Sequence, residues 1–239
     1  MDKKIGIFDS GIGGLTILKE LEKKIPNENY IYYKDTNNNP YGEKSDDELY
    51  SIVNDIVKYL ITNDVKLIVI ACNTATTKCM KKLRAEYPDI IFVGTVPAIK
   101  VACDNHSKKT LVMATPLTIG AERTNEIVTD NKKNDQDITL LPCDGLANAI
   151  EKNDNIDEVL DRILFPYKNS DIDSVVLGCT HYPIIKDKIK KYFSNDVNIY
   201  DSINGVVKEV NRQLKINMMY NKSKKEDTII IDSSKSNML

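Results

Sequence analysis

The chain has 239 residues and a mass of 27.0 kDa, enough for one large α/β domain or two compact lobes with separate cores. The net charge of −2 gives no strong field that would favour nucleic acid or an anionic membrane surface. "MDKK" leads into a first strand without the apolar region of a signal peptide, and no apolar run approaches the roughly 20 residues that span a bilayer. We therefore expect a cytoplasmic protein with no nucleic-acid or membrane partner.

Strand-like and helix-like segments alternate along the chain. In the first half, apolar runs and helical spacing predict strands over residues 4–8, 29–35, 65–72 and 90–96 and helices over residues 15–25, 46–63 and 74–87. In the second half they predict strands over residues 109–115, 137–143 and 173–180 and helices over residues 121–130 and within 145–168. This alternation indicates an α/β fold of mostly parallel sheets flanked by helices. "TIII" near the C-terminus leaves two alternatives open, an edge strand of the first lobe or a disordered end.

Two segments of the chain have the same form. "LIVIACNTAT" and "SVVLGCTHYP" each join a buried strand to a cysteine and a polar turn, and their cysteines, Cys72 and Cys179, are 179 − 72 = 107 positions apart. "KIGIFDSG" and "KTLVMATP" begin at a similar offset, at Lys4 and Lys109. We therefore expect two pseudo-symmetric lobes with the active site in the cleft between them. The expected lobes are residues 1–96 with 206–239, and residues 97–205.

The cysteines form neither a disulfide framework nor a zinc pattern. Their number is odd, they include no CxxC pair, and the two histidines do not show zinc-type spacing to them. We therefore expect reduced thiols and no metal site. The five cysteines are Cys72, Cys79, Cys103, Cys143 and Cys179, and the two histidines are His106 and His181.

Cys72 and Cys179 differ from the other cysteines because their flanks, Asn73-Thr74 and Thr180-His181, supply hydrogen-bonding groups in the same register at the end of a predicted strand. Asp9 and Thr115 are predicted at the ends of two further strands, where open α/β sheets place their active sites. Amide dipoles at a helix N-terminus stabilise a thiolate. Inverting a stereocentre requires one group to remove a proton from one face and another to return it to the opposite face, which suits two equivalent thiols. Cys79, Cys103 and Cys143 lack such matched flanks, and we interpret them as small buried hydrophobic residues.

The stretch "FDSGIGG" after the first strand has the outline of a nucleotide-binding loop. However, Thr16 stands where the third glycine of GxGxxG would be, and no Walker lysine follows. The carboxylate of Asp9 would also repel a phosphate. We expect the glycines to bring the backbone close to a small zwitterion, with Asp9 facing its ammonium group or Cys72.

Five motifs in this order and spacing closely resemble the glutamate racemase family, a member of the cofactor-independent aspartate/glutamate racemase superfamily. They are "FDSGIGGLT", "NPYGEKS", "ACNTAT", "PCDGLANAIE" and "GCTHYP", between about residue 4 and residue 205. The resemblance implies an isomerase that interconverts L- and D-glutamate and supplies D-glutamate for peptidoglycan, and hence for the cell wall and cell shape. It also implies a homodimer that uses neither pyridoxal phosphate nor a metal.

The resemblance further implies the roles of individual residues. Cys72 would act on the D-enantiomer and Cys179 on the L-enantiomer, as the two acid/bases at Cα. Asp9 would assist near Cys72, and His181 would support the Cys179 side with Glu151 as its partner. No arginine falls in a motif, so backbone N–H groups and polar side chains would hold the carboxylates. The residues implied to hold the substrate are Asp9, Ser10, Tyr41, Gly42, Asn73, Thr74, Thr180 and His181.

Two stretches depart from the family pattern and leave substrate breadth and dimer arrangement open. Residues 35–39 replace the usual Asp-Thr-Ala-Arg before "PYG", and "ATPLTIG" replaces Ala-Thr, a small residue and Thr. The nearest alternative is a racemase of aspartate or of acidic amino acids in general. A more distant one is a Cys–His hydrolase using Cys179 and His181, in which Cys72 would have no role. A non-catalytic nucleotide- or partner-binding protein is supported only by the glycine loop.

Overall fold

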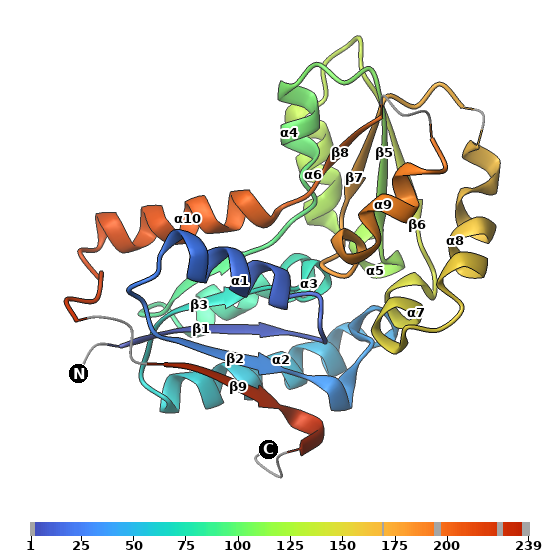
Figure 1. Cartoon of the computed structure of the whole chain (residues 1–239). Helices are drawn as coiled ribbons and strands as arrows, with labels where there is room; N and C mark the ends of the chain where they lie inside the picture. Colours follow the sequence, from blue (N-terminus) through green and yellow to red (C-terminus); the bar gives the residue numbers. More distant parts are fainter. Residues whose placement is uncertain (1–2, 169, 194–196, 224–226, 236–239) are drawn as a thin grey trace. The chain divides into compact units, whose positions relative to one another are not determined.

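The computed structural model of the chain describes residues 3–168, 170–193, 197–223 and 227–235. The chain divides into two units, Met1–Thr95 with Ile203–Leu239, and Val96–Ser202. These boundaries lie one and three residues from the ones expected after residues 96 and 205. Each unit has its own parallel sheet with helices packed against it (Figure 1), so the expected α/β fold class is confirmed. No helix in the described part of the chain is long and apolar enough to cross a membrane.

The first unit is built on a parallel sheet with the strand order β4-β3-β1-β2-β9. Its strands are β1 (Lys4–Asp9), β2 (Tyr30–Lys34), β3 (Val65–Ile70), β4 (Ile91–Gly94) and β9 (Thr228–Asp232). Its helices are α1 (Leu15–Lys24), α2 (Asp46–Thr62), α3 (Asn73–Glu86) and α10 (Ile203–Ile216), with the short 3-10 helices η1 (Thr36–Asn38), η2 (Tyr41–Glu43) and η5 (Ser233–Lys235).

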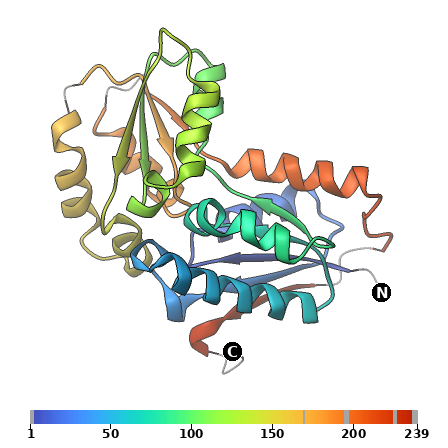
Figure 2. The same ribbon diagram turned by 180° about the vertical axis from the view of Figure 1, so that it is seen from behind.

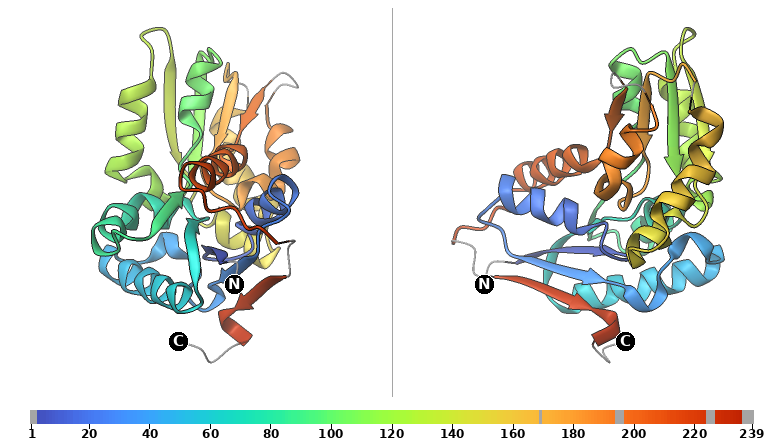
Figure 3. Two further views of the ribbon diagram at one scale, coloured as in Figure 1. Left: turned by 90° about the vertical axis from the view of Figure 1, so that its left-hand side faces the viewer. Right: turned by 45° about the vertical axis from the view of Figure 1, so that its right-hand side comes forward.

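Alternate side chains of the central strands of this sheet enter two different cores, because successive residues of a strand point to opposite faces. Along β3, Leu67 and Val69 pack in the core with α1 and α10, whereas Ile68 and Ile70 pack in the core with α2 and α3. This explains why the strand is buried along its whole length. Figure 2 shows α2 and α3 in front of the sheet, and Figure 3 shows α10 running beside α1.

The strand β9 decides between the two alternatives for "TIII". It pairs in parallel with β2, with Ile231 beside Tyr33 and Asp232 beside Lys34. Lys34 Nζ lies 3.0 Å from Asp232 Oδ2, which adds an ion pair at the same point of the register. The stretch is therefore an edge strand of the first unit, and residues 236–239 lie outside the described residues.

The second unit is built on a parallel sheet with the strand order β6-β5-β7-β8. Its strands are β5 (Lys109–Ala114), β6 (Asp137–Pro142), β7 (Ser174–Leu177) and β8 (Asn198–Tyr200). Its helices are α4 (Ile99–Asp104), α5 (Pro116–Ile119), α6 (Glu122–Asn131), α7 (Leu146–Lys152), α8 (Ile156–Leu164) and α9 (Lys186–Lys190), with the 3-10 helices η3 (Phe165–Tyr167) and η4 (Tyr182–Ile185). Residues of α4 and α6 share one core with the sheet, and residues of α7, α8 and α9 share the other.

The two sheets have the same topology. Read in the corresponding direction, β4-β3-β1-β2 of the first unit matches β8-β7-β5-β6 of the second. This agreement supports the internal duplication, because Cys72 follows β3 and Cys179 follows the equivalent strand β7. In each sheet the strand order reverses beside the first strand, between β1 and β3 and between β5 and β7. Open α/β sheets bind ligands at the carboxyl ends of the strands at such a switch point.

Candidate active site

The strand-end residues singled out from the sequence lie at these two switch points. Asp9 is the last residue of β1, and Cys72 follows β3 by two residues. In the second unit, Thr115 directly follows β5, and Cys179 follows β7 by two residues. All four side chains are buried. Each unit therefore carries one thiol at the carboxyl end of an equivalent strand.

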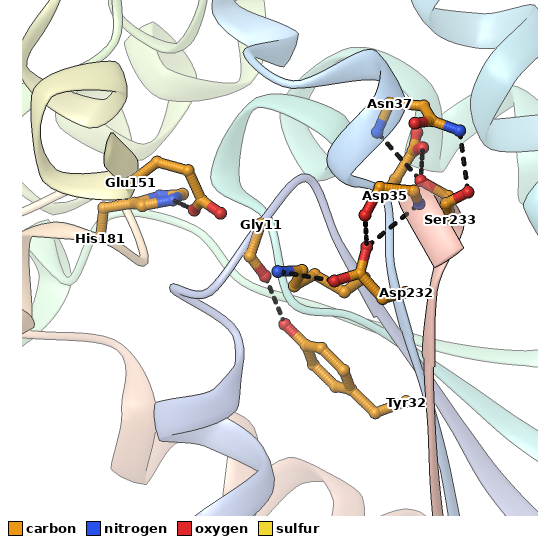
Figure 4. Close-up of polar contacts among 10 residues, drawn as sticks. Gly11, Tyr32, Asp35, Asn37, Glu151, His181, Asp232 and Ser233 are labelled. Carbon is orange, nitrogen blue, oxygen red and sulfur yellow. Dashed lines mark hydrogen bonds and ion pairs between the residues drawn. The ribbon is translucent and has the colours of Figure 1, made fainter. Parts of the chain in front are cut away.

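A buried carboxylate organises the glycine loop of the first unit. Asp9 Oδ2 accepts the backbone N–H of Gly14 at 2.7 Å, and Tyr32 Oη donates to the carbonyl of Gly11 at 2.8 Å (Figure 4). A Cβ atom on Gly14 would lie 2.8 Å from both the Asp9 Cβ and the Tyr32 hydroxyl, closer than real Cβ contacts. Glycine is therefore required at position 14, and the loop amide binds a carboxylate of its own chain where a nucleotide-binding loop would hold phosphate.

Cys72 lies at the N-terminus of α3. Its backbone is extended, with φ −139° and ψ 122°, and its carbonyl accepts the N–H of Thr76 at 2.9 Å. This conformation places the residue at the positive end of a 14-residue helix, where amide dipoles stabilise negative charge. Cys179 differs in this respect, because the segment that follows it is the short 3-10 helix η4.

Asn73 follows Cys72 and is 2% exposed. Within the described residues, neither its Oδ1 nor its Nδ2 has a hydrogen-bond partner. A buried amide without a partner is costly in free energy, and nearly all buried polar atoms in proteins are paired. The side chain is thus suited to a polar ligand at the carboxyl end of the sheet.

Tyr41 is a buried phenol in the loop between β2 and α2. Its hydroxyl donates to Asp35 Oδ2 at 2.7 Å. Burial raises the pKa of Tyr41 well above its ordinary value, and the nearby charges of Asp35, Cys72 and Asp9 raise it further. The phenol therefore remains protonated and acts as a hydrogen-bond donor. Gly42 follows Tyr41 within η2.

In the second unit, Cys179, His181 and Glu151 form a chain of contacts. His181 Nε2 lies 2.7 Å from Glu151 Oε2 (Figure 4). An ionised carboxylate has no proton to give, so this ring nitrogen donates. In the neutral imidazole, Nδ1 is then an acceptor, and it lies 3.7 Å from Cys179 Sγ. The carboxylate thus fixes the ring so that a proton acceptor faces the thiol.

The other cysteines lie in apolar surroundings. Burial raises the pKa of Cys79 and of Cys143 to about 12, and it also raises the pKa of Cys103. These thiols remain protonated near neutral pH and are poor candidates for proton transfer. Their environment agrees with their interpretation as small buried hydrophobic residues.

The structure brings the candidate site residues together within each unit. In the first unit, the carboxyl end of the sheet carries Asp9, Ser10, Tyr41, Gly42, Cys72, Asn73 and Thr74. In the second unit, the candidate site residues are Glu151, Cys179, Thr180 and His181. Among the described residues, no three or more His, Cys, Asp and Glu side chains are grouped so that they could hold a metal ion. Asp35 is not among the site residues expected from the sequence, although it lies directly after β2, at a strand end like those of Asp9 and Cys72.

Comparisons with known proteins place the chain in a family. The family model "Asp/Glu/Hydantoin racemase" matches residues 17–210. A glutamate racemase of Clostridium perfringens is 41% identical over 235 residues, which cover 96% of this chain and 90% of that protein. A glutamate racemase of Clostridium novyi is 40% identical over 238 residues, with 98% and 92% covered.

Solved structures give the same result. Escherichia coli glutamate racemase in complex with L-glutamate and the activator UDP-MurNAc-ala has a TM-score of 0.87 and 29% identity, over 99% of this chain and 91% of that one. Francisella tularensis glutamate racemase in complex with D-glutamate has a TM-score of 0.85 and 31% identity, over 97% and 88%. The chain belongs to the Asp/Glu/hydantoin racemase family and is a racemase, that is, an isomerase.

Proposed function

We propose that this racemase interconverts L- and D-glutamate, with Cys72 and Cys179 as its two acid/bases. The observation that carries the proposal is the equivalence of the two thiols. Each lies two residues beyond the corresponding strand of two sheets with the same strand order, at the end where such sheets bind ligands. Two equivalent thiols match a reaction whose substrate and product are mirror images at Cα.

The proton transfer is balanced without an oxidant or reductant. One cysteine, as thiolate, takes the Cα proton from one face and becomes a thiol, which leaves carbanionic charge on the substrate. The other cysteine, as thiol, gives its proton to the opposite face and becomes a thiolate. The proposal requires one thiol on each face of Cα. By the resemblance stated above, Cys72 acts on D-glutamate and Cys179 on L-glutamate.

The groups beside each thiol support these roles. Asp9 lies at the same switch point as Cys72, and its carboxylate also holds the glycine loop through Gly14. On the other side, the Nδ1 acceptor of His181 faces Cys179. A thiol whose proton has an acceptor at hand is more readily converted into the basic thiolate. Asp9 and the pair of His181 and Glu151 therefore act as aids to the two bases.

The names and bound ligands of the relatives support glutamate as the substrate. The curated relatives at 39–41% identity are named glutamate racemases, and the Escherichia coli and Francisella tularensis structures contain L- and D-glutamate. The unpaired amide of Asn73 adds a donor and an acceptor suited to the carboxylate or ammonium group of an amino acid. Asp9, Ser10, Tyr41, Gly42, Thr74, Thr180 and His181 complete the proposed substrate-binding set.

Membership in a racemase family removes the non-catalytic alternative and disfavours the Cys–His hydrolase. The nearest alternative, a racemase of aspartate or of acidic amino acids in general, shares both thiols and differs in the length of side chain accepted. Parallel assays with L- and D-aspartate distinguish it. A kcat/KM for aspartate equal to that for glutamate would indicate a racemase of acidic amino acids in general. A higher value for aspartate would make aspartate the substrate.

Incubation of the purified chain in D2O with L- or D-glutamate and no added cofactor tests the function. We expect inversion from either enantiomer, with deuterium incorporated at Cα. If neither inversion nor exchange occurs, the proposal is wrong. The same activity after dialysis against EDTA is expected, because the proposed proton transfer uses side chains and no metal ion.

We also propose that the D-glutamate enters peptidoglycan synthesis in the cytoplasm and that the enzyme is a homodimer, as the resemblance implies. Expression in a bacterial strain that depends on added D-glutamate tests the first point, since growth without the supplement is expected. Sedimentation equilibrium tests the second, and a monomer mass of 27.0 kDa would contradict it.

A further inference from the structure

The loop between β2 and α2 carries Tyr41 and Gly42 but has weak backbone support of its own. It contains the two 3-10 helices η1 and η2. The backbone hydrogen bonds that close them, Asn39 N–H to Thr36 and Lys44 N–H to Tyr41, are both 3.4 Å long. Since hydrogen bonds weaken beyond about 3.2 Å, the position of this loop depends on side-chain contacts.

Asp35 is the centre of those contacts. It is 1% exposed, and its carboxylate accepts the Tyr41 hydroxyl at 2.7 Å and the Asn38 Nδ2 at 3.0 Å. Its backbone N–H donates to the carbonyl of Asp9 at 2.9 Å. Through its carboxylate and its backbone N–H, this one buried residue connects the Tyr41 loop to the strand that ends in Asp9.

A residue far along the chain completes this network. Ser233 Oγ donates to Asp35 Oδ1 at 3.2 Å and accepts the backbone N–H of Asn37 at 2.9 Å. The carbonyl of Ser233 accepts Asn37 Nδ2 at 2.9 Å. Figure 4 shows Asp35, Asn37 and Ser233 gathered around these bonds, with Asp232 beside them. Ser233 is itself only 6% exposed.

The sheet register explains why Ser233 reaches this position. In the parallel pair of β2 and β9, Asp232 lies beside Lys34, and the two side chains form an ion pair at 3.0 Å. The residues that follow, Asp35 and Ser233, therefore leave the sheet side by side. The edge strand β9 acts as the anchor of the contact.

We propose that Ser233 is a positioning residue of the active site. Together with Asn37 it holds Asp35 and the loop of residues 36–43, and Asp35 in turn orients Tyr41. The C-terminal strand thus contributes to the substrate site without touching the substrate. The part of this inference that concerns binding rests on the proposed function of Tyr41 and Gly42.

Replacement of the hydroxyl tests the inference in the full-length enzyme. In Ser233→Ala the competent loop conformation should be less populated, so KM for glutamate should rise about three- to ten-fold, the effect of losing one or two hydrogen bonds. kcat should change less than KM. Amide hydrogen exchange of residues 36–43 should become faster in the same variant. Ser233→Thr, which keeps the hydroxyl, should restore both quantities.

Ser234→Ala is the matched control. Ser234 is the exposed next residue, and it bonds to Asp232 rather than to the loop. It should leave KM and the loop exchange unchanged. An unchanged KM and loop exchange in Ser233→Ala, or equal effects of the two alanine variants, would overturn the inference. If Ser233→Ala does not fold, Asn37→Ala tests the same contact from the exposed side of the loop.

Two further measurements separate this inference from the proposed function. In a Tyr41→Phe background, which already lacks the bond to Asp35, Ser233→Ala should raise KM by a smaller factor than in the wild type. Additive effects would contradict the route through Tyr41. If the wild-type enzyme does not racemise glutamate but Ser233→Ala still speeds exchange of residues 36–43, the positioning contact stands and the proposed substrate is wrong.

Discussion

Glu151 holds His181 by the ring nitrogen that does not face Cys179. The Nε2–Oε2 distance is 2.7 Å, and Nδ1 lies 3.7 Å from the Cys179 sulfur. His181 is buried, whereas the Glu151 side chain is 12% exposed. The contact therefore selects the imidazole tautomer and keeps its acceptor directed at the thiol.

Glu151→Gln should lower the rate of L-glutamate turnover by about ten-fold or more, since a hydrogen bond to a charged group contributes about 1.5–3 kcal/mol. Glutamine keeps the approximate shape but removes the negative charge that stabilises a protonated ring. The kcat of both directions is measured by following chirality. The control is Glu158→Gln on the exposed face of α8, which should leave kcat unchanged. Equal kcat in wild type and Glu151→Gln would contradict the role of this pair.

Replacement of either thiol should stop hydrogen exchange of one glutamate enantiomer and leave that of the other. Cys72→Ala should still exchange the Cα hydrogen of L-glutamate in D2O but not that of D-glutamate, and Cys179→Ala should show the reverse. Each should lower full racemisation at least about a hundred-fold, because one acid/base is missing. Exchange of both enantiomers in either variant would contradict the assignment of one face to each cysteine.

Cys79→Ala is the matched control for these variants. Cys79 is a buried thiol on the same helix α3, and burial raises its pKa to about 12. Its removal should lower the free energy of unfolding through a small cavity while leaving the exchange pattern intact.

Gly14→Ala should disrupt the glycine loop. The new Cβ would meet the Asp9 Cβ and the Tyr32 hydroxyl at 2.8 Å, so the Gly11–Tyr32 bond or the Gly14–Asp9 bond must give way. We expect a loss of about 1–3 kcal/mol in the free energy of unfolding and a higher KM for glutamate. Urea titration and steady-state kinetics measure the two quantities.

Gly205→Ala provides the opposite case. This glycine lies within α10, and nothing lies within 4 Å of a Cβ added to it. The substitution should raise the free energy of unfolding by about 0.5–1 kcal/mol, because alanine favours the helix. A loss of stability in Gly205→Ala similar to that in Gly14→Ala would show that the contacts at position 14 are not the cause.

Cys143 should make the protein less stable at alkaline pH. Burial raises its pKa from 9.0 to about 12, so between these values the unfolded chain releases the thiol proton while the folded chain retains it. The unfolded state then binds fewer protons, and the free energy of unfolding falls as pH rises. The stability from this group is complete below pH 9 and is lost towards pH 12.

Comparison with Cys143→Ala isolates this contribution from the tyrosines that titrate in the same range. Urea titrations at several values between pH 9 and 11 should give a steeper decline for the wild type, by up to about 1.4 kcal/mol per pH unit. Equal slopes would show that the thiol proton is not retained in the folded state.

Much of the fold followed from local pattern. Buried strands such as Val65–Ile70 and amphipathic helices such as Asp46–Thr62 were predicted close to their observed bounds, because side-chain periodicity reports which faces are covered. The pattern does not predict short elements such as Ile99–Asp104 and Asn198–Tyr200. An element of so few residues is too short to show a clear periodicity. The long helix Ile203–Ile216 was also missed, although its buried residues fall at helical spacing.

The sequence by itself determined which chemical groups are paired by duplication, because Cys72 and Cys179 follow equivalent strands and carry polar flanks in the same register. The resemblance carried by its motifs also implied that Glu151 partners His181, and only the tertiary structure decided that Ser233 reaches Asp35 beside Tyr41. The contact of Asp35 with Ser233 joins residues 198 positions apart. Such contacts depend on strand order and sheet register, which bring together side chains whose spacing along the chain carries no signal of their proximity.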